Sequence, residues 1–233
     1  MRGTSFTFRQ FIVNQDRCAM KVGTDGVLLG AWARGGGKIL DIGTGTGLIA
    51  LMMAQRFAIA HVTAVEIDGD AASQASANVA QSPFAGRIAV VESSIQEFCS
   101  ECKFDSIVSN PPFFTGSMKN PDSQRATARH ADTLSYHGLF AAVQRLLADG
   151  GEFSAVIPDD CLAEFTAAAY LAHLVLVRRC AIRTTPRKRP KRYLVAFRHD
   201  TDCVAAETDE QCLMRADGTR SEWYESLTGD FYL

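Results

Sequence analysis

Hydrophobic positions form short apolar runs, separated by helical stretches, from residue 38 onward. The runs that indicate buried strands are KILDIG, HVTAVEID, RIAVVES and FDSIVSN. Between the first three lie TGLIALMMAQRF and GDAASQASANVAQ, which have the composition of helices. This β-α-β-α-β order with a further strand predicts a parallel sheet that is covered by helices on both faces.

The second half of the chain adds two helices and three strands to this pattern. We expect a helix at 136–147, a strand at GEFSAVI and a helix from Asp159 to about Leu171. Two β-rich runs follow, HLVLVRRCAI and RYLVAFRH, and the basic, proline-containing segment between them predicts a long hairpin loop. Without an internal repeat or a linker, the simplest organisation is one α/β domain at 38–233 after an N-terminal extension at 1–37.

Composition is that of a soluble globular protein. The 233 residues are 47% hydrophobic and 21% charged. The N-terminus lacks a signal-peptide core and no apolar run approaches the roughly 20 residues that span a bilayer, so a cytoplasmic protein without membrane contact is expected. Seven cysteines, an odd number, favour reduced thiols. Cys99 and Cys102 form a C-x-x-C without a partner at zinc-ligand spacing, so no metal site is predicted.

Charge is distributed unevenly along the chain. The formal net charge is −2, yet the segment 178–192, RRCAIRTTPRKRPKR, holds eight basic residues and no acid. Without those eight, 16 of the 24 basic residues remain against 26 acids, so the rest of the chain carries −10. A basic stripe on an acidic body favours a polyanionic partner, whereas the alternative is a solvated charged hairpin. The candidate contacts are Arg187, Lys188, Arg189, Lys191 and Arg192.

A glycine-rich turn, DIGTGTG at 41–47, follows the first predicted strand. A dinucleotide fingerprint would place its third glycine where Leu48 stands, and no Lys-Ser/Thr pair follows as in a P-loop. Glycines at every second position allow a ligand to approach the backbone closely. The candidate ligand-binding residues are therefore Gly43, Gly45 and Gly47, and the ligand need not be a phosphate.

Two carboxylates near this turn indicate what the ligand is. Glu66 ends the second strand nineteen residues after Gly47, where it can accept hydrogen bonds from both hydroxyls of a ribose. Asp41 precedes the glycines and can face an ammonium group. Together they favour a nucleoside with a cationic amino-acid tail, which is S-adenosylmethionine (SAM). The alternative is a glycine-rich turn and an exposed carboxylate in some other α/β protein.

These features, together with SNPPFF at 109–114 after the fourth strand, resemble the class I SAM-dependent methyltransferases. The resemblance implies a Rossmann-like, three-layer α/β/α sandwich. Its seven-stranded, mostly parallel sheet would have the order 3-2-1-4-5-7-6, with the seventh strand antiparallel. It also makes Ile67, next to Glu66, a cofactor-binding candidate. Ser94 stands where the family often has an acid that faces the adenine amino group.

In that family N-P-P-[FY] acts on planar, conjugated nitrogens, such as N6 of adenine or the side-chain amide of glutamine. The lone pair of such a nitrogen is delocalised, so the site must make it available. Asn110 Oδ1 and the Pro111 carbonyl can each accept one N–H, Pro111 and Pro112 fix both acceptors, and Phe113 stacks on the ring. Asn110 also faces the cofactor. The alternative for this tetrapeptide is a stiff strand exit.

Further stretches resemble the bacterial tRNA1(Val) (adenine(37)-N6)-methyltransferase family nearly from end to end. They are MKVGTDGVLLGAW, DIGTGTGLIAL, AVEID, SNPPFF, ARHADTLS and the last five residues. In that family the N-terminal segment covers the cofactor, which implies that Lys21, Thr24 and Asp25 line the SAM pocket, with Lys21 at the methionine carboxylate. The alternative is a helix cap by Thr24 or Asp25 and a surface lysine.

The resemblance implies a methyl transfer to an unpaired adenine of the tRNA anticodon loop. Arg125 and Arg129, in the polar segment after NPPF, are candidates for binding RNA, and His130 lies beside them. The basic hairpin would hold phosphates at the edge of the sheet far from the glycines. Two rival enzymes are a glutamine-N5 methyltransferase of release factors and a ribosomal RNA guanine-N2 methyltransferase. A SAM-binding protein without catalysis is a third alternative. The sequence fixes no oligomeric state, and a monomer is favoured.

Overall fold

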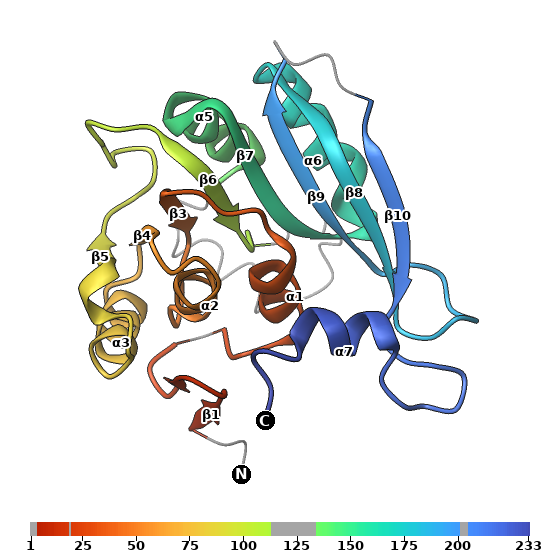
Figure 1. The fold of residues 1–233 in the computed structure, drawn as a ribbon. Helices are drawn as coiled ribbons and strands as arrows, with labels where there is room; N and C mark the ends of the chain where they lie inside the picture. The colour runs from red at the N-terminus through yellow and green to blue at the C-terminus, as the bar shows by residue number, and fades with distance from the viewer. Residues whose placement is uncertain (1–3, 19, 113–133, 201–204) are drawn as a thin grey trace, which may run out of the picture.

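The computed structural model describes residues 4–18, 20–112, 134–200 and 205–233. An eight-stranded sheet crosses the molecule in the order β10-β8-β9-β7-β6-β3-β4-β5 (Figure 1). Its strands are β3 (Lys38–Ile42), β4 (His61–Glu66), β5 (Ile88–Glu92), β6 (Phe104–Ser109), β7 (Leu147–Pro158), β8 (Leu174–Arg183), β9 (Arg192–His199) and β10 (Glu207–Cys212).

The order of the first seven strands confirms the expectation. Strands β3 to β7 pair in parallel, and β9 runs antiparallel to its neighbours β7 and β8. The expected count of seven strands is wrong, because β10 adds an eighth that pairs in parallel with β8. Its sequence, ETDEQC, has no apolar alternation, and most of its residues are exposed. An edge strand of this kind is held by backbone pairing, which leaves no hydrophobic signal.

Helices cover both faces of the sheet (Figure 1). On one face lie α1 (Thr24–Trp32), α2 (Leu48–Arg56) and α3 (Gly69–Ala80), and on the other α5 (Tyr136–Leu146) and α6 (Leu162–Leu171). All except α1 were predicted from the sequence. Short 3-10 turns at Ala85–Arg87 and Asp159–Cys161 complete the connections. Within the described residues no helix is long and apolar enough to span a bilayer.

Each face of the sheet has its own hydrophobic core. On the α5 and α6 side, Phe140, Phe153, Phe165 and Phe197 are fully buried. Neighbouring rings in this group lie 4.7–6.4 Å apart between centroids. Such edge-to-face and offset contacts add to the free energy gained by burial. The other core is built mainly from α1, α2 and the strands beneath them.

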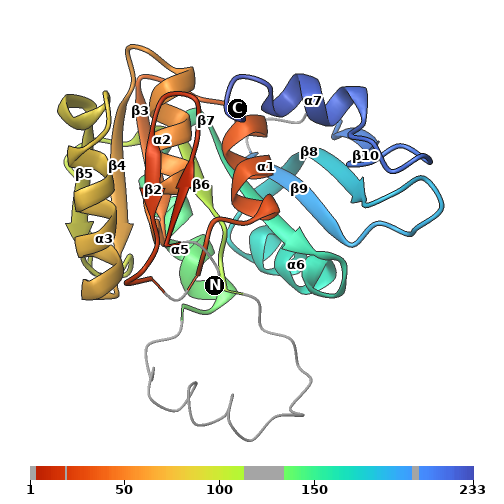
Figure 2. The same ribbon diagram turned by 90° about the horizontal axis from the view of Figure 1, so that it is seen from below.

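The two ends of the chain pack against that second core and against each other. A small hairpin, β1 (Ser5–Thr7) and β2 (Ile12–Asn14), lies near one end, and α7 (Glu222–Thr228), which packs beside α1, lies near the other (Figures 1 and 2). Arg9 joins them, because its backbone N–H donates to the Phe231 carbonyl at 2.9 Å and its side chain donates to the Tyr232 carbonyl at 2.5 Å. The N-terminal residues therefore share a core with the sheet, and a boundary at residue 37 stays a prediction.

Candidate cofactor and active site

The carboxyl ends of β3, β4 and β6 bring the principal sequence candidates to one edge of the sheet. Parallel strands that end at the same edge place their following loops side by side. A cavity of about 340 Å³ lies there, between the glycine loop, the start of α1, the residue after β6 and the start of β9. Of the residues predicted to act, its walls contain Lys21, Thr24, Asp25, Gly43, Gly45, Asn110 and Arg192.

The glycine loop needs glycine for its backbone conformation. Gly43, Gly45 and Gly47 have φ of +70°, +57° and +81°, a region that strains any residue with a side chain. A Cβ built on Gly43 would meet nothing within 4 Å, so this backbone is open to a ligand. Gly47 instead begins α2 as its N-cap, and a Cβ there would contact Ala75 of α3 at 3.4 Å. Gly43 and Gly45 thus face the cavity, whereas Gly47 serves helix packing.

Residues 14–18 lie against α3 and over the glycine loop. The backbone N–H groups of Asn14 and Arg17 donate to the side-chain oxygens of Asn78 and Gln74, at 2.9 and 3.1 Å. Asn78 also donates to the Thr46 carbonyl at 2.8 Å, which links this segment to the loop. This part of the N-terminal segment therefore lies beside the glycine loop, and its role as a cover of the cofactor stays a prediction.

Glu66 supports the loop from the end of β4. Its carboxylate accepts hydrogen bonds from the backbone N–H groups of Gly45 at 2.8 Å, Ile67 at 2.9 Å and Asp68 at 3.1 Å. A second, smaller cavity of about 60 Å³ lies beside it and includes Ile67 and Ser94 in its wall. Ile67 is 52% exposed, so an apolar surface is available there for a planar ring. Ser94 also accepts from the Glu97 N–H at 3.3 Å and donates to its carboxylate at 3.0 Å.

Asp41 is completely buried and does not line the cavity. Its Oδ2 accepts from the Thr44 hydroxyl at 2.5 Å and from the Ala50 N–H at 3.1 Å, which ties the glycine loop to α2. Burial raises the pKa of the Asp41 carboxyl to about 7, against the lowering effect of the Thr44 hydroxyl and the Ala50 N–H. The structure does not bring Asp41 to the position predicted for it, facing an ammonium group in the cavity.

Because of this buried carboxyl, the stability of the fold is expected to decrease as the pH rises from about 5 to about 8. A pKa raised to about 7 in the folded chain, from 3.8 when unfolded, means that the folded state binds more protons in this range. Its contribution to the free energy of unfolding should decrease by about 2–3 kcal/mol across the range. Asp41→Asn keeps an acceptor oxygen and removes the titration. Urea unfolding of both proteins at the two pH values measures the difference, and equal pH dependence in the two would contradict the assignment.

Asn110 follows β6 at the mouth of the cavity. The preceding residue, Ser109, donates to the Ile42 carbonyl at 2.9 Å, so the strand end is fixed to β3. The Asn110 Nδ2 lies 3.6 Å from Met20 Sδ, while its Oδ1 is buried without a partner in the described part of the chain. A buried acceptor without a donor is costly unless a ligand supplies one. Pro111 is buried and Pro112 exposed. The remaining candidates of this region, Phe113, Arg125, Arg129 and His130, lie outside the described residues.

Asp25 and Arg192 form an ion pair in the cavity wall. The N-cap of α1 is Gly23 with no side-chain cap bond, so the alternative in which Thr24 or Asp25 caps the helix is wrong. Burial raises the pKa of the Asp25 carboxyl, and the Arg192 guanidinium opposes this shift. The expectation that the basic segment lies far from the glycine loop is therefore wrong for Arg192. Because β9 is antiparallel, its first residue lies at the edge where the parallel strands end.

The rest of the basic hairpin points to solvent. Arg187, Lys188, Arg189 and Lys191 are exposed, and none of them forms an ion pair with any residue that the structure describes. Arg183, at the end of β8, is paired with Glu210 at 2.7 Å. Among the described residues, the hairpin thus presents four positive charges without an ion-pair partner beyond the edge of the sheet that holds the cavity.

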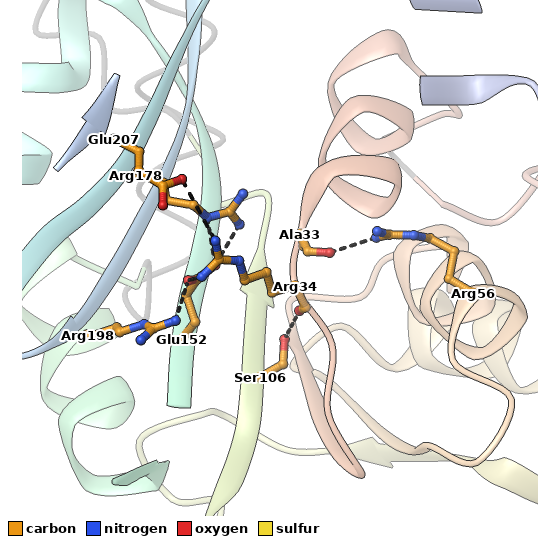
Figure 3. Close-up of polar contacts among 8 residues, drawn as sticks. All are labelled: Ala33, Arg34, Arg56, Ser106, Glu152, Arg178, Arg198 and Glu207. Carbon is orange, nitrogen blue, oxygen red and sulfur yellow. Dashed lines mark hydrogen bonds and ion pairs between the residues drawn. The ribbon is translucent and has the colours of Figure 1, made fainter. Parts of the chain in front are cut away.

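A second charged cluster lies deeper in the sheet, around Glu152 of β7 (Figure 3). This carboxylate is 3% exposed and accepts from Arg178 at 2.6 Å, Arg198 at 3.3 Å and Arg34 at 3.5 Å. Arg178 also lies over the Trp32 ring, 3.8 Å from its centroid. The cluster joins α1 to three strands below the level of the cavity. Sequence reasoning missed it, because its members are far apart in the chain.

Similarity to known proteins shows to which family this chain belongs. The methyltransferase small domain family matches residues 22–175. A curated relative from Phocaeicola vulgatus, named tRNA1(Val) (adenine(37)-N6)-methyltransferase, is 51% identical over 98% of this chain and 97% of its own length. A relative of the same name from Aeromonas hydrophila is 44% identical over 100% of this chain and 98% of its own. The chain belongs to the tRNA1(Val) (adenine(37)-N6)-methyltransferase family.

Solved structures agree with the family's fold. A predicted O-methyltransferase from Agrobacterium tumefaciens has a TM-score of 0.64 at 19% identity, covering 89% of this chain and 96% of its own. A glycopeptide N-methyltransferase complexed with SAM has a TM-score of 0.56 at 14% identity, covering 77% of this chain and 100% of its own. These likenesses show the fold, and SAM is the cofactor expected of a member of this methyltransferase family. The open glycine backbone, the Glu66 carboxylate and the two adjoining cavities fit this cofactor.

Proposed function

We propose that this chain transfers a methyl group from SAM to N6 of adenine 37 in the anticodon loop of tRNA1(Val). The observation that carries the proposal is the Oδ1 of Asn110, which is buried without a partner among the described residues and belongs to the wall of the cavity that the glycine loop lines. The curated relatives carry this activity in their names. When bound, SAM supplies an electrophilic methyl group on a sulfonium.

In this proposal the chain's own residues bind and align the two reactants. Glu66 accepts the ribose hydroxyls, Gly43 and Gly45 admit the cofactor to the backbone, and Ile67 and Ser94 flank the base. Asn110 Oδ1 and the Pro111 carbonyl accept the two N–H groups of the adenine amine, which directs its lone pair toward the methyl group. Alignment of this kind lowers a barrier by roughly 7–11 kcal/mol when the geometry is near-attack. No strong base is required before the transfer.

The basic hairpin favours an RNA substrate over the release-factor glutamine. An enzyme that binds a release-factor glutamine needs no concentrated positive charge, whereas an enzyme that binds the phosphates around an anticodon loop does. An anticodon-loop adenine is already unpaired, so less energy is spent on exposing it than on flipping a base out of a duplex. Phe113 is proposed to stack on this adenine, which contributes roughly 1–3 kcal/mol. Arg125 and Arg129 remain proposed RNA contacts, and a monomeric enzyme is proposed.

The test is methyl transfer from radiolabelled SAM to three substrates offered separately. Unmodified tRNA1(Val), ribosomal RNA and a release factor are each incubated with the full chain, and the labelled nucleoside or residue is identified after digestion. Label in N6-methyladenosine at position 37 of the tRNA is expected. Label in the release factor or in guanine of the ribosomal RNA would overturn the proposal in favour of one of the rivals.

The exposed hairpin is expected to set the salt dependence of tRNA binding. Single-stranded contacts give a slope of roughly −0.7 in log affinity against log salt for each phosphate neutralised. Replacing Arg187, Lys188 and Arg189 together with Ser should therefore flatten the slope by about two units. Discrimination between tRNA species should survive, because phosphate contacts carry no sequence information. Filter binding over a salt series measures the slope, and an unchanged slope would make the segment a solvated hairpin.

A further inference from the structure

The wall of the cavity formed by α1 and β9 contains charged groups of both signs. Asp25 comes from the first turn of α1, Arg192 from the first residue of β9, and Lys21 from the segment before α1. Glu66, the residue proposed to bind the ribose, lines the smaller cavity instead. The two cavities share Gly43. A cofactor whose adenosine lies beside Glu66 thus extends its amino-acid end past Gly43 into the larger cavity.

We propose that Arg192 binds the carboxylate of the SAM amino-acid end and that Asp25 positions the Arg192 guanidinium for this contact. The inference rests on the proposed placement of SAM along the glycine loop. A guanidinium has five N–H donors in a planar fork that matches a carboxylate. Asp25 Oδ1 accepts from Nη1 of Arg192, and the other donors of that guanidinium have no partner among the described residues. The arginine thus retains donors for a second carboxylate.

The burial of the pair explains why Arg192 suits this role better than Lys21. The side chains of Arg192 and Asp25 are 26% and 28% exposed, and the ion pair restrains the guanidinium. Lys21 lines the same cavity but is exposed, and no ion pair in the described part of the chain restrains its ammonium group. A cation that is already held in place loses less conformational entropy when a ligand binds. The same burial separates Arg192 from the four exposed cations of the hairpin.

The test compares SAM with decarboxylated SAM, which lacks only the carboxylate. Calorimetry with the full wild-type chain should show that SAM binds at least about tenfold more tightly, as expected for a charge-assisted hydrogen bond. Arg192→Gln should lose this preference while it binds decarboxylated SAM as the wild type does, which also shows that the variant is folded. Arg192→Lys should keep part of the preference, and Asp25→Asn should reduce it. Lys21→Gln serves as the matched control and should keep the preference in full.

Four results would overturn the inference. A wild-type chain that binds both ligands equally would have no carboxylate contact. An Arg192→Gln variant that still prefers SAM over decarboxylated SAM would show that Arg192 does not contact the carboxylate. A variant that loses affinity for both ligands equally would give Arg192 a structural role only. Loss of the preference in Lys21→Gln instead would assign the carboxylate to Lys21. All four would leave the proposed methyl transfer intact, whereas a wild-type chain that binds neither ligand would refute the cofactor placement itself.

Discussion

Asn110→Ala is expected to reduce the turnover number by about a hundredfold to a thousandfold, the usual effect of removing one preorganised hydrogen bond to the reacting group. The variant removes the acceptor Oδ1, which is buried without a partner in the described part of the chain. SAM affinity should stay nearly unchanged, because Glu66 and the glycine loop are untouched. Single-turnover methylation of tRNA, together with calorimetric titration of SAM, separates the two effects.

Asn110→Asp is the control for this prediction. It keeps an acceptor oxygen in nearly the same place and should retain more activity than the alanine variant. Wild-type turnover in Asn110→Ala would mean that SNPPFF is only a strand exit. An equal loss of SAM affinity and turnover would assign Asn110 to the cofactor alone.

Glu152→Ala is expected to destabilise the fold by about 3–5 kcal/mol, as when one partner of a buried ion pair is removed. The carboxylate contacts Arg34, Arg178 and Arg198 and is 3% exposed. Without it, Arg178 and Arg198 lose the one carboxylate with which they form an ion pair among the described residues, whereas Arg34 keeps Glu207 at 3.8 Å. The Arg178 side chain is only 12% exposed. Urea unfolding followed by circular dichroism gives the change in the free energy of unfolding.

Glu152→Gln is the matched variant, because it keeps the shape and one acceptor oxygen but not the charge. Its free energy of unfolding should lie between that of the wild type and that of Glu152→Ala. SAM affinity at low temperature should be retained by both variants, since Glu152 is not in either cavity wall near the cofactor. Equal free energies of unfolding for Glu152→Ala and the wild type would show that the arginines do not need the Glu152 carboxylate.

The sequence predicts the central sheet because its strands are apolar runs at regular spacing. The same rule brings the glycine loop, Glu66 and Asn110 together, since all three lie at or just after the ends of parallel strands. The hydrophobic pattern does not reveal α1, because its sequence TDGVLLGAW is nearly apolar on all sides. The helix is buried between α2 and the sheet, with Val27, Leu28 and Leu29 fully buried, so no polar face marks it.

Two parts of the site depend on tertiary contacts that no local pattern reveals. Asp25 and Arg192 lie 167 positions apart in the chain, and only the antiparallel direction of β9 brings them together. Asp41 stands in the expected motif, but the motif does not say where its carboxylate points. In the fold its Oδ2 accepts from Thr44 and Ala50, and Asp41 does not belong to the cavity wall.

The bond between Arg9 and Tyr232 has a consequence for the order of folding. It joins residues 223 positions apart, and the cost of closing a loop grows with the length of chain between its ends. The sheet can form through shorter connections, so the N-terminal hairpin gains its contact with the C-terminal residues only after most of the chain has folded. If SAM binds as proposed, a partly folded chain would therefore present Glu66 before the N-terminal hairpin reaches its final position.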